Sequence, residues 1–479
     1  MKILLYNWVQ FDQNDGGGVT VYLKNIINDL VTDEDVEVYF LSSGTNFNLF
    51  SKKVKVKQTK NLLGDKVKSY TIYNSPVLFA HNQFSRVDIY NNDKTLVDVI
   101  DNFIEKNEGF DVIHFNNLEG ISVEVLKLKE KYKKTKFIYS MHNYFPICPN
   151  VYLWSHDCEN CKNYEQGKKC CGCIESSYSK AILAQKISTF FKKFNIDTNS
   201  PKMKKIYTKI KKILKIKNKD NKDNKDNKEN NREIDYSNAD DYRIFREKNV
   251  EYINKYVDEV LCVSKRVLEI AVKYGIDREK CYVSYIGTKF ANNLTRQKID
   301  INSKDFNFIY LGYMNKMKGF DFLIESLNKL DNNRASNINL TLVCRNNSDY
   351  DIKEILNNLK KKFKSVKYVD GYTHDNLKDL LEGQHLGVIP VVWEDNLPQV
   401  SIEVTSFGVP ILCSDLGGAS ELCDDDSFRF IGNNTEDFIK KLESILDDRN
   451  KLLEFWDKYN KPTKMEEHIK ELYSHYGIK

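Results

Sequence analysis

Long apolar runs are missing from this sequence of 479 residues. No window approaches 18 uninterrupted apolar residues, which excludes an ordinary membrane-spanning helix. The first residues, MKILLYNWVQFDQNDGGG, hold too short an apolar segment for a secretory signal and are more typical of a first buried strand. We therefore expect a cytoplasmic protein whose 11 cysteines are reduced thiols.

A strong excess of one charge is also missing. The 73 basic residues are nearly balanced by 68 acidic ones, so the composition indicates no nucleic-acid partner. No G-x-G-x-x-G fingerprint follows a predicted strand, which argues against a nicotinamide-dependent dehydrogenase. Material for packed cores is ample, because 41% of the residues are hydrophobic and 28 are tyrosines.

The chain is long enough for two domains, and its pattern repeats accordingly. Apolar strands alternate with helical segments in both halves, the first opening with KILLYNW and the second with FNFIYLGY. Such strands predict parallel sheets covered on both faces, with a cleft between the carboxyl ends of their strands. We expect an α/β protein with two Rossmann-like domains, residues 1–300 and 301–462. A C-terminal helix over 463–479 is expected to pack back on the first domain.

An insertion over about residues 148–250 interrupts the first half. Its low-complexity run, NKDNKDNKDNKE, has nothing to bury, so we expect disorder over about 217–235. Its six cysteines include two close pairs that would give a structural zinc ion four thiolates. The first choice of ligands is Cys158, Cys161, Cys170 and Cys173, with Cys148 or Cys171 as substitutes. Reduced thiols in a flexible loop are the alternative.

A basic amphipathic segment lies in the same insertion. In PKMKKIYTKIKKILKIKNK, apolar residues recur at helical spacing and lysines fill the other positions. The apolar stripe consists of Met203, Ile206, Tyr207, Ile210, Ile213 and Leu214. Such a helix is suited either to an anionic membrane surface or to packing its stripe on the first domain.

The stretch WEDNLPQVSIEVTSFGVPILCSD combines an acidic turn with the start of a helix. Pro398 suits the first helical turn, and Gly408 followed by Pro410 suits the exit. The pattern predicts a helix over about 398–407.

The start of that helix predicts a ligand site. Its free amides and the positive end of its dipole favour an anion. The candidate donor-binding positions there are Asn396, Leu397, Gln399 and Val400. Asp395 lies in the turn, and the side chain of Glu403 leans towards the same end of the helix. A phosphate site with two acids for hydroxyl groups is typical of nucleotide-sugar binding; a capping acid and an ordinary helix glutamate are the alternative.

These residues resemble those of the retaining glycosyltransferases of family GT4, which have the GT-B fold. The family carries two acids eight positions apart, the first near the donor sugar and the second on the ribose. Asp395 and Glu403 match that pattern, and Glu394 is the neighbouring candidate if the turn is shifted by one residue. The following segment, CSDLGGASEL, matches as well, and the resemblance covers most of the chain outside the insertion.

Two further motifs agree with the resemblance. LGYMNKMKGF is similar to the family segment G-R-L-x-x-x-K-G, which implies that Lys318 contacts the donor diphosphate. The family's arginine is replaced by Tyr313, and Arg345 is a candidate for the missing charge. NDGGGVTVYL matches the family's glycine loop, in which Gly17 and Gly18 let the backbone approach a phosphate or sugar.

A third motif, YSMHNYFPICP, places His142 just beyond a predicted strand. In the family, the histidine of this loop lies beside the transferred sugar and helps to position it. A structural histidine held by hydrogen bonds is the alternative.

The resemblance implies transfer of a sugar from a nucleotide diphosphate donor with retention at the anomeric carbon. The departing phosphate would take the acceptor proton, and Lys318 with the amides at 397–400 would neutralise its charge. No D-x-D pattern follows a strand where a catalytic metal would bind, so none is expected. A GT-B nucleotide-sugar epimerase is one alternative. A non-catalytic, transferase-like binding protein, favoured by Tyr313, is another.

The resemblance also bears on the acceptor. Many relatives build surface polysaccharides on polyprenyl diphosphate carriers, so the acceptor is expected to be a glycan or a polyprenyl-linked molecule. Residues 201–217 would then attach the protein peripherally to the cytoplasmic face of an anionic membrane.

Overall fold

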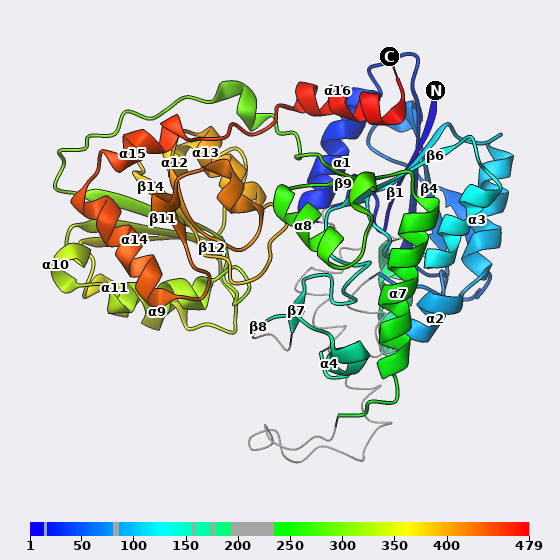
Figure 1. The fold of residues 1–479 in the computed structure, drawn as a ribbon, viewed down its shortest axis with the longest axis horizontal. Helices are drawn as coiled ribbons and strands as arrows, with labels where there is room; N and C mark the ends of the chain where they lie inside the picture. Colours follow the sequence, from blue (N-terminus) through cyan, green and yellow to red (C-terminus); the bar gives the residue numbers. More distant parts are fainter. Residues whose placement is uncertain (14–16, 80–85, 156–158, 174–177, 193–233, 479) are drawn as a thin grey trace.

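The computed structural model describes residues 1–13, 17–79, 86–155, 159–173, 178–192 and 234–478. Two α/β domains lie side by side, and the chain returns from the second domain to the first at its C-terminal end (Figure 1). The segment 201–217 and all of 217–235 except its last two residues lie outside the described residues.

The N-terminal domain is built on a sheet of eight described strands. In sheet order these are β10 (Cys281–Val283), β9 (Glu259–Cys262), β6 (Lys136–Met141), β5 (Val112–Phe115), β1 (Lys2–Asn7), β2 (Glu37–Asn46), β4 (Val67–Tyr73) and β3 (Lys55–Gln58). Neighbours pair in parallel except β3, which runs antiparallel to β4 at the edge. Five of the six residues of β1 are buried, as expected for a sheet covered on both faces.

Amphipathic helices cover this sheet. They include α1 (Gly17–Leu30), α2 (Val87–Asn92), α3 (Thr95–Lys106) and α8 (Lys265–Lys273). The buried stripe of α1 contains Tyr22, Leu23, Ile26, Ile27 and Leu30. Each such apolar side chain contributes about 1.5–3 kcal/mol through burial.

The insertion supplies two short strands and three α-helices among the described residues. They are β7 (Trp154–Ser155), β8 (Glu159–Asn160), α4 (Lys168–Cys171), α5 (Tyr178–Lys192) and α7 (Ala239–Tyr256). β7 and β8 pair as a short antiparallel ladder. The long helix α7 packs on α2 and on α4.

The C-terminal domain has a six-stranded parallel sheet among its described residues. In sheet order the strands are β13 (Ser365–Val369), β12 (Ile338–Arg345), β11 (Phe306–Tyr313), β14 (Leu386–Ile389), β15 (Ile411–Ser414) and β16 (Arg429–Phe430). Its helices are α9 (Phe320–Lys329), α10 (Asn332–Ala335), α11 (Ile352–Lys360), α12 (Leu377–Leu381), α13 (Gln399–Ser406), α14 (Thr435–Asp447) and α15 (Lys451–Glu454). The predicted α/β architecture of two parallel-sheet domains is confirmed.

The last helix, α16 (Met465–Tyr476), contacts the first domain. Its His468 ring lies 2.8 Å, Nε2 to Oη, from Tyr22 of α1, and Tyr473 donates to Asp33 at 2.9 Å. In the part of the chain that is described, none of the helices is long and apolar enough to cross a bilayer.

Candidate functional site at the domain junction

The predicted helix after the acidic turn is α13, which begins at Gln399 and ends at Ser406. Pro398 has extended backbone angles (φ −60°, ψ 115°) and caps the helix, so it lies just before the first turn rather than inside it. The first amides of any helix have no acceptor within the helix, and the positive dipole end adds to their attraction for an anion. We call the turn and the start of α13 the candidate anion-binding end.

Lys318 and Asp395 meet at this end of α13. The Nζ atom of Lys318 lies 2.6 Å from Oδ2 of Asp395, whose side chain is 9% exposed. The ammonium also lies 5.6 Å from the ring centre of Trp393. Lys318 reaches this position through a tight turn at Gly319, whose φ is +75° and where a Cβ atom would lie 1.6 Å from the Pro390 carbonyl oxygen.

Glu403 lies one turn further along α13 and is buried. Its carboxylate accepts a 2.9 Å hydrogen bond from the Tyr372 hydroxyl and lies 3.2 Å from Nε2 of His374. The hydrogen bond to Glu403 raises the pKa of His374 above its usual value. The sequence analysis predicted neither partner, although GYTHDN follows Asp370, one residue beyond β13 at the carboxyl end of the sheet.

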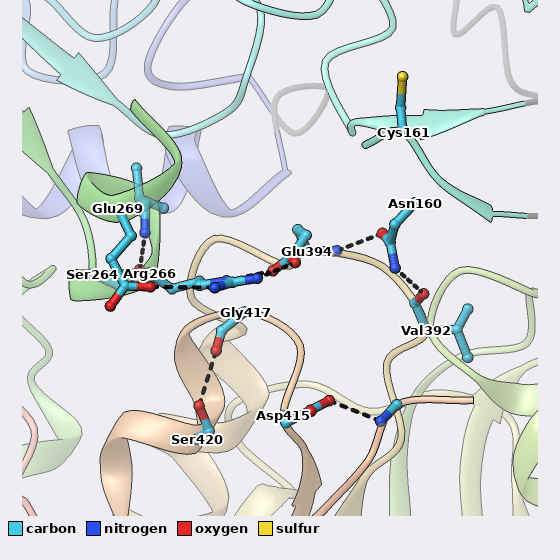
Figure 2. A network of polar contacts seen from close by, with 12 residues as sticks. Asn160, Cys161, Ser264, Arg266, Glu269, Val392, Glu394, Asp415, Gly417 and Ser420 are labelled. Atoms are coloured by element: carbon cyan, nitrogen blue, oxygen red, sulfur yellow. Dashed lines mark hydrogen bonds and ion pairs between the residues drawn. The ribbon is translucent and has the colours of Figure 1, made fainter. Parts of the chain in front are cut away.

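Glu394, the alternative acid, has a different role. Its carboxylate pairs with the Arg266 guanidinium of α8, with Nε 2.8 Å from Oε2 (Figure 2). Since Glu394 is bound to the first domain, Asp395 is the acid of the two that lies beside Lys318.

The backbone of the turn is fixed by close contacts. Ser264, the capping residue of α8, donates from Oγ to the Asn396 carbonyl at 2.7 Å. Gly417 has a φ of +80°, and a Cβ atom there would lie 1.9 Å from the Asp395 carbonyl oxygen. The side-chain nitrogen of Asn396 is buried without a partner among the described residues. Leu397 is buried and Val400 partly buried at the same end of α13.

The glycine loop of the first domain meets the start of α13. Gln399 donates from Nε2 to the Gly18 carbonyl at 3.0 Å. Gly17 adopts a φ of +59° at the first position of α1. The loop and the candidate anion-binding end thus lie together although 381 residues separate Gly18 from Gln399.

Tyr313 and Arg345 end two adjacent strands. They are register partners in the parallel pair β11 and β12, which places them side by side at the carboxyl edge. Tyr313 is 61% exposed, and Arg345 has no ion pair within the described ranges. The role of Arg345 as the source of the missing charge stays a prediction.

His142 directly follows β6, as its motif predicts. Its ring lies 4.7 Å from the ring of Tyr22, which is itself bonded to His468 of α16. Burial lowers the pKa of His142 to about 3, so its imidazole is neutral. Among the described residues, Nε2 of His142 has no hydrogen-bond partner.

Four cysteines of the insertion line one small cavity. Its lining includes Cys148, Cys161, Cys170, Cys173 and Arg246. Cys158, part of the first predicted zinc set, lies outside the described residues. Cys171 does not line the cavity and donates to the Gly167 carbonyl. Within the described part of the chain, no three His, Cys, Asp or Glu side chains are arranged to hold a metal ion.

Arg246 carries a buried charge beside these thiols. Its Nη2 lies 3.4 Å from Cys170 Sγ, and its guanidinium lies 4.3 Å from the ring centre of Tyr164. No carboxylate in the described ranges pairs with it. Burial raises the pKa of the neighbouring Cys148 thiol to about 12.

The chain was compared with a family model and with solved structures. Residues 292–463 match the family model Glycosyl transferases group 1. The chain is similar to Anabaena Alr3699/HepE, solved in complex with UDP, with a TM-score of 0.57, 12% identity and 100% of both chains covered. It is also similar to a sucrose-phosphate synthase from Thermosynechococcus elongatus (TM-score 0.55, 12% identity, 100% of this chain and 98% of that one). The search of curated proteins gives no match.

A third solved structure, the lipopolysaccharide outer core galactosyltransferase WaaB, has a TM-score of 0.56 and 11% identity over 100% of this chain and 99% of its own. At these identities the likeness shows the fold, which is GT-B: two Rossmann-like domains with the candidate residues at their junction. With the group 1 match over the C-terminal domain, the protein is a transferase enzyme of the glycosyltransferase class.

Proposed function

We propose that this enzyme is a retaining glycosyltransferase of family GT4 that moves a sugar from a nucleotide diphosphate sugar to an acceptor. The observation that carries the proposal is the Lys318–Asp395 pair at the candidate anion-binding end of α13, with Glu403 one turn away. This constellation offers a cation and helix amides for a diphosphate and two carboxylates for hydroxyl groups.

In this account each side chain has a defined part. Lys318, the amides of 397–400 and Arg345 stabilise the departing diphosphate, whose oxygen takes the acceptor proton. Glu403 binds the ribose, with Tyr372 and His374 holding its carboxylate in place. Asp395 and the glycine loop approach the transferred sugar. His142 is neutral and offers its unpaired Nε2 to a sugar hydroxyl, so it positions the sugar rather than acting as an acid.

No catalytic metal is part of the proposal. The charge of the diphosphate is balanced by Lys318 and the helix end, the work that a divalent cation does in other transferases. Incubation with a panel of nucleotide sugars, followed by measurement of donor hydrolysis, tests the assignment. Release of nucleoside diphosphate from at least one donor is the expected result.

The two alternatives give different outcomes in the same assay. A nucleotide-sugar epimerase would convert the donor without an acceptor and without releasing free sugar. A non-catalytic binding protein, for which Tyr313 is the supporting observation, would bind a nucleotide and turn over no donor.

For the acceptor, we propose a glycan or polyprenyl-linked molecule used in surface polysaccharide synthesis. The basic segment 201–217, which lies outside the described residues, would attach the protein to the cytoplasmic face of an anionic membrane. About 1 kcal/mol for each lysine near such a surface is enough for reversible attachment.

For the insertion, we propose a structural zinc ion held by its cysteines. Four thiols line one cavity, although in the described residues they are not arranged around a metal ion, and Arg246 is buried there without a carboxylate partner in those ranges. Metal-bound thiolates would supply the negative charge that a buried guanidinium needs. The cavity favours Cys148 over Cys171 as the substitute ligand beside Cys161, Cys170 and Cys173.

A further inference from the structure

The turn that carries Asp395 is held from outside its own domain. Residues 390–398 connect β14 to α13 and have no regular secondary structure. Because they belong to no ladder, the polar backbone groups of this turn need other partners. Two of these groups bond to one side chain of the N-terminal domain.

That side chain is Asn160, at the end of β8 in the cysteine-rich insertion. Its Nδ2 donates to the Val392 carbonyl at 3.1 Å, and its Oδ1 accepts from the Glu394 amide at 3.2 Å (Figure 2). The carboxamide thus bonds to the turn as a neighbouring strand would, with one donor and one acceptor two residues apart.

A second contact of the insertion lies between these two bonds. The ring of Tyr152 meets the ring of Trp393 edge-on, with centres 5.1 Å apart and planes at 87°. Trp393 is the residue over which the Lys318 ammonium lies. The insertion therefore contacts residues directly adjacent to the Lys318–Asp395 pair.

The same turn is bound by the body of the first domain through Arg266, so Glu394 is held at its amide by Asn160 and at its carboxylate by Arg266. Domains joined through polar contacts of this kind move relative to each other by default. The Asn160 bonds form only when the two domains are together.

We propose that Asn160 is a positioning residue, through which the cysteine-rich insertion fixes the turn of residues 390–398 (the donor turn) when the two domains meet. With the turn fixed, Asp395 and Lys318 have one geometry. Without Asn160, residues 392–395 lose their contact with the first domain at the backbone. The effect on the turn follows from the contacts alone, whereas the effect on catalysis rests on the proposed function.

The turn itself is tested by amide hydrogen exchange in the full-length protein. Asn160→Ala removes both bonds. Lys162→Ala is the matched control, since this exposed side chain has no hydrogen bond or ion pair to the described residues. Loss of the bond from the Glu394 amide should make exchange over 391–397 about fivefold faster in Asn160→Ala, and exchange should be unchanged in Lys162→Ala. Equal protection in all three proteins overturns the proposal.

A near-isosteric variant guards against misfolding. Asn160→Leu nearly keeps the size of the side chain but can neither donate to the Val392 carbonyl nor accept from the Glu394 amide, so it should also speed exchange over 391–397. Normal protection in a folded Asn160→Leu protein contradicts the proposal.

Catalysis gives the second measurement. In Asn160→Ala, kcat should fall about tenfold because the reacting groups are less well placed. The Kd for UDP, used as a probe, should change less than twofold because the proposed diphosphate ligands all lie in the C-terminal domain. Unchanged kcat overturns the role in positioning. If Asn160→Ala shows faster exchange but the wild type turns over no donor, the role of Asn160 in holding the turn is supported and the proposed function is contradicted.

Discussion

The ammonium of Lys318 lies 2.6 Å from the carboxylate of Asp395, so the two groups neutralise each other at the end of α13. A diphosphate brings its own negative charge to the same helix end. It would compete with Asp395 for the lysine and free that carboxylate for a sugar hydroxyl. In the proposed function, the pair would link phosphate binding to sugar binding through one exchange of partners.

Removing either donor-site charge should impair transfer. Lys318→Ala and Glu403→Ala are each expected to cost about 2–4 kcal/mol of transition-state stabilisation, the scale for a lost charge-assisted contact in a closed site. The measurement is kcat/KM for the donor, with thermal unfolding as the check on folding. Lys316→Ala, which changes an exposed lysine in the same turn, is the control and should retain full activity. Near-normal activity in both site variants would show that the donor lies elsewhere.

The C-terminal helix should make stability depend on pH. His475 of α16 lies 2.7 Å from Glu259 and 3.7 Å from Glu471, and these carboxylates raise its pKa to about 9 against the pull of burial. A raised folded-state pKa gives stability that is complete below the unfolded value of about 6.5 and is lost as pH rises towards 9.

This shift corresponds to about 3 kcal/mol at most. We therefore expect the free energy of unfolding to fall between pH 6.5 and 9 in the wild type. His475→Gln should be less stable at pH 6 and should show a flatter profile across that window. Parallel profiles for the two proteins, measured by denaturant unfolding, would contradict this assignment.

The cysteine cavity should hold one zinc ion per chain. Metal analysis of the purified protein is the measurement, and Cys161→Ser and Cys170→Ser should each lose the metal because a tetrahedral site needs four ligands. Cys171→Ser is the matched control, since its thiol does not line the cavity. A zinc content well below one per chain in the wild type would rule out the site.

The segment 201–217 should bind the protein to anionic membranes. Sedimentation with liposomes that contain anionic lipid should recover the intact protein at low salt, and binding should weaken at high salt because lysine charges are screened. Deletion of 201–217 should abolish it. Liposomes of neutral lipid provide the control, and equal binding by the deleted protein would refute the role of this segment.

Local patterns in the sequence were enough to predict the sheets and the position of α13. Strand periodicity and the pair Pro398 and Gly408 are properties of neighbouring residues, so they are visible without a fold. The partners of Glu403 were not predictable in this way, because Tyr372 and His374 reach it from a loop about 30 residues away. Nor was the choice between Asp395 and Glu394, which depends on Arg266 from the other domain.

The contacts of the insertion were also not predictable from local sequence patterns. Its cysteine spacing indicated a metal site, but nothing in the spacing suggested that Asn160, just before Cys161, bonds to the donor turn 232 residues away. Contacts between domains depend on how two finished folds pack, and a single sequence carries no periodic signal for that.

The most direct test of the central claim is the anomeric configuration of the first product. The enzyme is incubated with the nucleotide sugar that it consumes, and the released or transferred sugar is followed by NMR before it can mutarotate. The account predicts that the product keeps the anomeric configuration of the donor, that nucleoside diphosphate appears in equal amount, and that Lys318→Ala loses both. An inverted product, or turnover that does not depend on Lys318, would contradict it.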